Sequence, residues 1–214
     1  MIYLLSDQHG GEKVGDLKSY IQNNNASDLL IILGDVGLKF TDTKENKEFD
    51  EFLLSSKNKI AIIDGNHENF RYLNSFKEEI WCGGVVNRIT DNVVHLKRGY
   101  VYEIDGKTFF VFGGCKSSEK WKEKGLWQME EMPTEEEILR AYKNLEKYNF
   151  KVDYILMHKY EKGESMPTQE LFELCKFIDE KVEFKHFYAG HWHESKVIDS
   201  KHTIVYDKLV EIKQ

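Results

Sequence analysis

The sequence predicts an α/β fold in which two mixed β-sheets pack against each other and helices cover their outer faces. Three observations lead to this prediction. Short apolar runs alternate with polar stretches over residues 2–63, turn signals separate short strand candidates in the middle of the chain, and strand–helix alternation returns after residue 153. Alternation with helices indicates parallel βαβ units, whereas a tight turn indicates antiparallel pairing. No stretch resembles a linker, so we expect a single domain over residues 1–214.

The N-terminal part repeats one pattern three times. Its apolar runs are continuous, which is typical of parallel strands buried on both faces. We expect these strands at residues 2–5, 29–33 and 60–63. The polar stretches after the first two runs are compatible with helices, the first ending near Asn25 and the second spanning residues 46–56.

The middle of the chain has a different character. Three short strand candidates lie at residues 93–96, 100–104 and 108–112. Asp105-Gly106 is a tight-hairpin signal between the last two, so we expect the three strands to form an antiparallel meander. A polar loop should follow over residues 115–132. A helix should then begin near Pro133, because Thr134 and Glu137 have the spacing of a capping box.

The last third of the chain returns to alternation. We expect a buried strand at residues 154–157, a helix over 168–181 and a further strand at 184–189. Three shorter segments should close the fold as hairpin strands: 197–198, 203–206 and 209–212.

Composition excludes several classes of protein. The formal net charge is −7 and no basic stripe is visible, which argues against binding of extended nucleic acid through its phosphates. Three widely spaced cysteines without a C-x-x-C pair indicate reduced core thiols. No signal peptide or transmembrane run is seen, so we expect a cytoplasmic protein without a membrane partner.

The residues suited to binding a metal follow the predicted strands. They are Asp7, His9, Asp35, Asn66, His67, His158, His191 and His193. In α/β sheets, ligands bind beyond the carboxyl ends of strands, where such side chains converge. From composition alone, Gly-Asn-His is expected about 0.03 times and Gly-His-x-His about 0.02 times. The ordered combination of motifs is therefore a strong indication of one shared site.

This ordered set resembles the calcineurin-like metallophosphoesterase family. The motifs are Asp7-Gln8-His9, Gly34-Asp35, Gly65-Asn66-His67-Glu68, the lone His158, and Gly190-His191-Trp192-His193. The resemblance extends over essentially the whole chain and is nearest to the small, single-domain bacterial and phage members. It implies the α/β/β/α sandwich of that family.

The resemblance also implies roles for these residues. One metal would be held by Asp7, His9 and His193, the second by Asn66, His158 and His191, and Asp35 would bridge the two. Imidazole and oxygen donors suit first-row ions, so we expect two divalent cations, with Mn²⁺ first and Fe or Zn²⁺ as alternatives.

The expected reaction is hydrolysis of a small phosphodiester or phosphomonoester by a metal-bridging hydroxide. The resemblance implies that His67 acts as general acid or orients the phosphate and that Asp35 belongs to the same catalytic centre. Position 38 is leucine, and no arginine closely follows Asp35, unlike in the protein phosphatases of the family. These differences favour phosphodiesters and argue against phosphoprotein substrates.

Alternatives to this interpretation remain. A nuclease acting on short or single-stranded ends and a non-catalytic, protein-binding scaffold on the same fold are both compatible with the motifs. The substrate partner would be a small phosphoester, with nucleotides included, and the oligomeric state is not readable from the sequence.

The loop over residues 115–132 has two interpretations. It is either a substrate-facing flap, with lysines meeting a phosphate and a tryptophan such as Trp127 stacking on a base, or a solvated loop with its tryptophans tucked into the domain. We assign Asp64 to hydrogen bonds within the turn or to groups that support the metal ligands, and not to metal coordination. Three histidines outside the motifs should be strand or surface residues: His95, His186 and His202.

Overall fold

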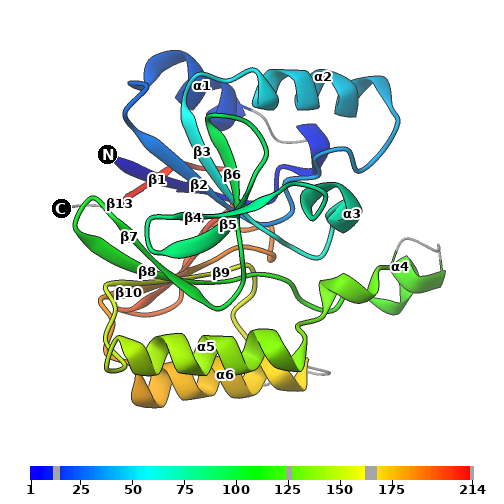
Figure 1. Cartoon of the computed structure of the whole chain (residues 1–214). Helices are drawn as coiled ribbons and strands as arrows, with labels where there is room; N and C mark the ends of the chain where they lie inside the picture. The colour runs from blue at the N-terminus through cyan, green and yellow to red at the C-terminus, as the bar shows by residue number, and fades with distance from the viewer. Residues whose placement is uncertain (12–14, 124–126, 162–167, 213–214) are drawn as a thin grey trace.

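Two β-sheets pack face to face between two layers of helices in the computed structural model, which describes residues 1–11, 15–123, 127–161 and 168–212 (Figure 1). Within these ranges the first sheet has seven strands. In spatial order they are β13 (Val210–Ile212), β1 (Ile2–Leu5), β2 (Leu29–Leu33), β3 (Lys59–Ile63), β6 (Val93–Leu96), β5 (Gly84–Arg88) and β4 (Glu78–Trp81). Strands β1, β2, β3 and β6 run parallel, and the other pairings are antiparallel.

The second sheet has six strands within the same ranges. Their order is β11 (Lys196–Val197), β12 (His202–Ile204), β10 (His186–Ala189), β9 (Tyr154–Met157), β8 (Lys107–Phe112) and β7 (Tyr100–Ile104). The central strands β12, β10, β9 and β8 are parallel, and a hairpin flanks them at each edge. Both sheets are therefore mixed, as the sequence predicts.

Helices cover the outer face of each sheet (Figure 1). Helices α1 (Gly15–Asn23) and α2 (Lys44–Leu54) lie over the first sheet, and α5 (Glu135–Lys147) and α6 (Gln169–Lys181) lie over the second. Side-chain caps begin two of them, because Thr43 accepts from the Asn46 amide and Thr134 forms the predicted capping box with Glu137. No helix in the described ranges is both long and apolar enough to cross a membrane.

The alternation of side chains in the central strands builds three core layers. Along β2, which is buried throughout, Leu30 and Ile32 pack under α1 and α2, whereas Ile31 and Leu33 face the second sheet. The third layer lies under α5 and α6 and includes Phe110 of β8. Continuous burial on both faces explains why these strands read as unbroken apolar runs. The α/β/β/α sandwich is thus confirmed.

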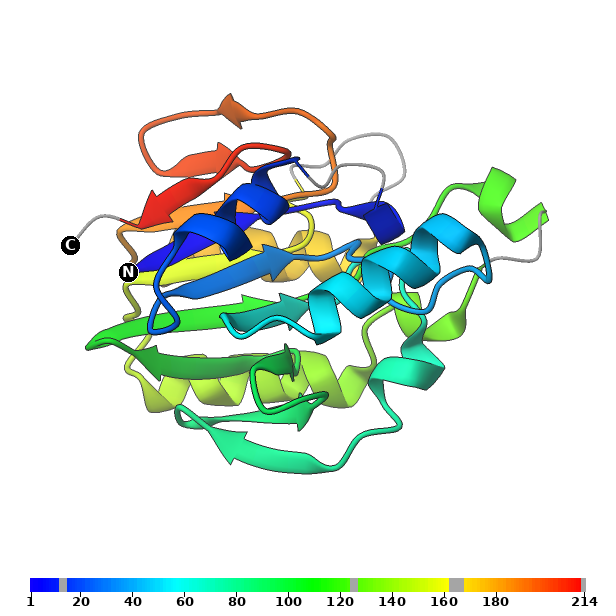
Figure 2. The ribbon, with the colours of Figure 1, turned by 90° about the horizontal axis from the view of Figure 1, so that it is seen from above.

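The short elements gather at one end of the sandwich, opposite the N-terminus (Figure 2). They are the 3₁₀ turns η1 (His9–Gly11) and η2 (Met129–Glu131) and the helices α3 (Phe70–Leu73) and α4 (Glu119–Glu123). Helix α4 and turn η2 fall in the stretch predicted as a loop. The carboxyl ends of β1, β2, β3, β9 and β10 point toward the same end.

The antiparallel meander predicted for residues 93–112 is wrong. Strand β6 pairs with β3 and β5 in the first sheet, and only the β7–β8 hairpin at Asp105-Gly106 matches the prediction. The chain passes between the sheets at residues 97–99. Gly99 makes this passage possible with φ of 77°, and a side chain there would press on the backbone of α5.

Two further differences concern sheet edges. The β4–β5 hairpin has no counterpart among the predicted elements, because three of the four β4 residues are exposed and no apolar run marks the strand. Strand β13 joins β1 in the first sheet, so it closes no hairpin with β12, whereas the predicted β11–β12 hairpin is present.

Candidate metal centre

All the side chains predicted to bind metal meet where the two sheets present their carboxyl ends. Loops after β1, β2 and β3 supply residues from the first sheet, and loops after β9 and β10 supply residues from the second. The site residues that follow these strands are Asp7 and His9, Asp35, Asn66 and His67, His158, and His191 and His193. The fold therefore brings together groups separated by more than half of the sequence.

A first set of donors lies around Asp7. One ligand atom from each of Asp7, His9, Asp35 and His193 falls within 4.8 Å of the others. His9 Nε2 lies 2.9 Å from His193 Nε2 and 3.8 Å from Asp35 Oδ2. Asp7 Oδ1 lies 3.4 Å from His193 Nε2. Two carboxylates and two imidazoles thus face one point.

A second set lies on the other side of Asp35. Asn66 Oδ1 is 3.0 Å from His158 Nε2 and 3.1 Å from His191 Nδ1. Asp35 Oδ1 is 3.5 Å from His158 Nε2, while its other oxygen faces His9. Asp35 is therefore placed between the two sets, with one oxygen toward each.

The hydrogen bonds of the second set suit a cation. His158 Nδ1 lies 2.8 Å from the carbonyl oxygen of Leu33, which only accepts, so Nδ1 carries the proton and Nε2 presents a lone pair. That lone pair faces Asn66 Oδ1, another acceptor, because Asn66 Nδ2 donates to Ser117 Oγ at 2.9 Å. A bound cation would satisfy both acceptors.

The first set also contains a buried acceptor atom that a cation would satisfy. Asp7 Oδ1 is buried and has no hydrogen-bond donor among the described residues. Burial alone would raise the pKa of Asp7, but hydrogen bonds from His193, Ser6 and the His191 amide help to hold the pKa below its ordinary value. Burial lowers the pKa of His191 to about 2. An ionised carboxylate and a neutral imidazole are the forms that bind metals.

Strained backbone aims several of these groups. Ten non-glycine residues of the described ranges have positive φ, and half of them belong to the site: Asp7, His9, Asp35, His191 and His193. The left-handed conformation costs roughly 1–2 kcal/mol per residue. Such strain persists where the surrounding structure enforces it, and it clusters at functional sites.

The motif glycines allow the loops to come close. A side chain at Gly34 would overlap the ring of His158, and one at Gly65 would overlap the Asp35 carboxylate. Glu68 then ties the same two loops together by accepting backbone hydrogen bonds from Val36, Gly37 and Gly65. These packing demands explain why glycine precedes both Asp35 and Asn66.

His67 faces the open side of the centre. Its amide donates to Asp35 Oδ1 at 2.7 Å, and its ring lies against that of Trp121, with centroids 4.3 Å apart. Burial lowers the pKa of His67, and the Asp35 carboxylate opposes this effect in part. Leu38 is buried in the core, so position 38 gives His67 no carboxylate partner. The ring of His67 instead contacts the aromatic ring of Trp121.

A cavity of about 380 Å³ opens above the two donor sets. Asp35, Asn66, His67, His191 and His193 form part of its wall. The remaining described lining comes mainly from the stretch after β8 and from the loop after β9: Lys116, Ser117, Trp121, Lys159 and Thr168. This volume is in the range of small-molecule sites.

Within residues 115–132, Trp121 is the tryptophan that faces the cavity, so the stacking role considered for Trp127 passes to Trp121. Trp121 lines the cavity, whereas Trp127 lies under the ammonium group of Lys122, 5.6 Å from ring centroid to Nζ. Of the four lysines considered for this stretch, Lys116 lines the cavity and Lys124 lies outside the described residues. Sequence patterns assign no conformation to residues 115–132, so the contact between Trp121 and His67 could not be predicted.

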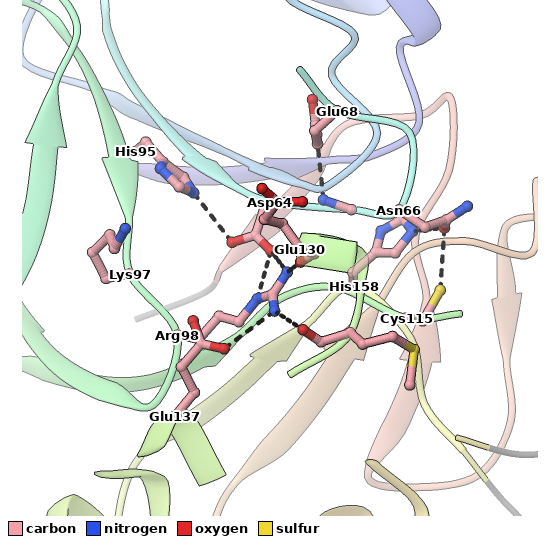
Figure 3. A network of polar contacts seen from close by, with 12 residues as sticks. Asp64, Asn66, Glu68, His95, Lys97, Arg98, Cys115, Glu130, Glu137 and His158 are labelled. Atoms are coloured by element: carbon pink, nitrogen blue, oxygen red, sulfur yellow. Dashed lines mark hydrogen bonds and ion pairs between the residues drawn. The ribbon is translucent and has the colours of Figure 1, made fainter. Parts of the chain in front are cut away.

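Sequence reasoning missed Cys115, which it assigned to the core. The thiol is fully buried, but Sγ lies 3.1 Å from Asn66 Oδ1 (Figure 3). It also lies 3.5 Å from His191 Nδ1. Burial raises the pKa of this thiol well above its ordinary value, so without a cation the sulfur keeps its proton. Cys115 directly follows Gly113-Gly114 at the end of β8, and this position was the available signal.

Behind the centre, Asp64 forms the hydrogen bonds expected of it. Its carboxylate accepts from Arg98 Nε at 2.7 Å and lies 3.1 Å from His95 Nε2 (Figure 3). All three side chains are buried. His95 is therefore an interior strand residue of β6, and His186 and His202 also lie in strands, β10 and β12.

Comparisons with known proteins identify the family of the chain. The family model described as calcineurin-like phosphoesterase matches residues 1–195. Among solved structures, the protein of unknown function AQ665 from Aquifex aeolicus is similar, with 15% identity, coverage of 86% of this chain and 87% of that chain, and a TM-score of 0.43. A search of curated proteins found no match. The family match spans nearly the whole chain, and the chain therefore belongs to the calcineurin-like phosphoesterases, which are metal-dependent phosphoric ester hydrolases.

Proposed function

We propose that the chain hydrolyses a small phosphodiester or phosphomonoester at a dinuclear metal centre. The observation that supports this most is the position of Asp35, with Oδ2 3.8 Å from His9 Nε2 and Oδ1 3.5 Å from His158 Nε2. A carboxylate shared between two donor sets is the arrangement expected of a bridging ligand.

The residues would divide between the two cations as the family resemblance implies. Asp7, His9 and His193 would hold one cation, Asn66, His158 and His191 the other, and Asp35 both. A bound pair supplies an activated water nucleophile and positive charge at phosphorus. The imidazole of His67, in the wall of the cavity, would orient the phosphate or protonate the leaving oxygen. Proton transfer by a positioned group typically contributes about 10²–10⁴-fold.

The charges around the cavity favour diesters over monoesters. None of the four arginines of the chain lines it, and the lining ammonium groups of Lys116 and Lys159 are paired with Glu119 and Glu161 at 3.2 and 2.8 Å. A phosphodiester carries a single negative charge and needs less neutralisation than a monoester dianion. Trp121 offers a face on which a base would stack, so we propose nucleotides as the substrate group.

An activity assay with a matched control tests this proposal. The protein is loaded with Mn²⁺ and given p-nitrophenyl phosphate, its bis ester and a panel of cyclic nucleotides. Asp35→Asn should lower kcat/KM by more than ~100-fold, beyond the loss typical of residues that support a ligand. The control is Asp28→Asn, since Asp28 is also buried but precedes β2 at the opposite end of the strand.

Three results would contradict the proposal. They are full activity of Asp35→Asn, equal losses in the two variants, and no Mn²⁺-stimulated turnover of any ester by a folded wild-type chain. The last result would favour the scaffold alternative. Cleavage of oligonucleotides with a steep salt dependence, and of nothing smaller, would favour the nuclease.

A further inference from the structure

The two halves of the candidate centre differ in chemistry because of Cys115. Donor atoms of Cys115, His158 and His191 lie within 4.8 Å of one another, and Asn66 Oδ1 lies between them, at 3.0–3.1 Å from all three. The first set, around Asp7, has carboxylates and imidazoles but no sulfur. The second set is therefore the softer one.

The segment that carries Cys115 is held in place on both sides. Before it, the Gly114 amide donates to the carbonyl of Asp64 at 2.8 Å, and Asp64 is itself anchored by Arg98 (Figure 3). After it, the Ser117 amide donates to Glu131 Oε2 at 3.0 Å, while Ser117 Oγ orients Asn66. The sulfur is thus directed at the second set by a fixed backbone.

The distances fit coordination. With Zn–S near 2.3 Å and Zn–N of 2.0–2.1 Å, a sulfur and a nitrogen ligand that subtend a tetrahedral angle at the metal stand about 3.5–3.6 Å apart. The sulfur of Cys115 lies 3.5 Å from His191 Nδ1. Side chains already spaced as ligands need little movement to accept an ion.

We propose that Cys115 is a fifth donor at the second metal position, beside Asn66, His158, His191 and the shared Asp35. It makes that position prefer Zn²⁺ or Co²⁺ over Mn²⁺; this inference rests on the dinuclear centre proposed above. Thiolate ligands select softer ions, whereas the carboxylates of the first set suit Mn²⁺. On binding, the S–H bond breaks, the proton leaves to solvent, and Sγ gives its electron pair to the cation. The centre would then hold two different metals.

A thiolate also changes the charge that a substrate meets. Two divalent cations against Asp7 and Asp35 leave about two positive charges, and the Cys115 thiolate lowers this to about one. The attraction for a dianionic monoester falls more than that for a monoanionic diester. The same residue therefore strengthens the preference for diesters.

Spectroscopic titration with Co²⁺ tests the proposal without any activity measurement. Metal-free wild type should bind two Co²⁺ per chain and develop a sulfur-to-cobalt charge-transfer band that saturates with one of them. Cys115→Ala and the isosteric Cys115→Ser should lose the band. In both variants the affinity for Zn²⁺ should fall at least ~10-fold more than that for Mn²⁺.

The control is Cys175→Ala, because Cys175 is equally buried but lies in α6 among core residues. It should keep the band. Two Co²⁺ bound by wild type without a charge-transfer band would overturn the role of Cys115 and leave the dinuclear centre standing. A folded wild-type chain that binds no Co²⁺ would overturn both.

Discussion

Replacing Arg98 with methionine removes the cation from a buried ion pair directly behind the candidate centre. Arg98 Nε donates to Asp64 at 2.7 Å, and another of its nitrogens donates to the carbonyl of Glu130 at 2.8 Å (Figure 3). A third donates to the carbonyl of Met132 at 3.1 Å. Arg98 and Asp64 are 4% and 2% exposed, so solvent cannot replace the lost partner. Breaking a buried pair by removing one member costs about 3–5 kcal/mol.

The loss is large enough to measure by thermal unfolding. A chain of this size loses roughly 2–4 °C in Tm per kcal/mol, so Arg98→Met should melt about 6–20 °C below wild type. Arg88→Met is the matched control, because Arg88 pairs with Glu79 at the surface, where the side chains are 31% and 40% exposed. Exposed pairs contribute about 0–1 kcal/mol, so this control should melt within about 4 °C of wild type.

The dependence on pH gives a second check. Burial alone would raise the pKa of Asp64, but Arg98 and His95 hold it well below its ordinary value. This stabilisation is present above the unfolded pKa, near 3.9, and is lost as pH falls through the folded value. In Arg98→Met, burial raises the pKa of Asp64. The difference in unfolding free energy between wild type and the variant should therefore become smaller as the pH is lowered from neutral. A melting point like that of the Arg88 control, or a difference that widens in acid, would refute the reasoning.

Two further outcomes follow from contacts elsewhere. Trp121→Ala should raise KM for nucleotides at least ~5-fold more than for p-nitrophenyl phosphate, because base stacking contributes about 1–3 kcal/mol. The control variant Trp127→Ala should show no such difference between the substrates. Equal effects of Trp121→Ala on both substrates would count against stacking. His202→Gln should destabilise the protein more at pH 6 than at pH 9 in urea unfolding. Asp179 and Asp199 raise the pKa of His202 despite its burial, and the stabilisation by protonated His202 disappears as the pH rises above the pKa in the folded state. A loss of unfolding free energy that does not vary with pH would contradict this.

The metal-site residues could be predicted because each follows a buried strand closely in sequence. Gly34-Asp35 and Gly65-Asn66-His67 end apolar runs, and the carboxyl ends of parallel strands meet at one edge whatever the order of those strands. The division into two sets around Asp35 came from the family resemblance, and the side chains of each set lie near one another. Local pattern and general sheet topology were sufficient to expect that these residues meet.

Features that depend on contacts between the sheets could not be predicted. Hydrophobic periodicity identifies β6 as a strand but carries no information about which sheet it joins. In the sequence, Cys115 looks like any small core residue, because its neighbours Asn66 and His191 lie in loops that follow strands of different sheets. The contact of Trp121 with His67 likewise arises from packing between distant segments.

The central claim is that seven side chains from both sheets form one centre for two cations. The most direct test is calorimetric titration of metal-free protein with Mn²⁺, checked by elemental analysis of the loaded chain. We predict two ions per chain for wild type, one for His9→Ala with the second position intact, and weakened binding of both ions in Asp35→Asn. A folded wild-type chain that binds one ion or none, or an Asp35→Asn variant that binds two with unchanged affinity, would contradict the account.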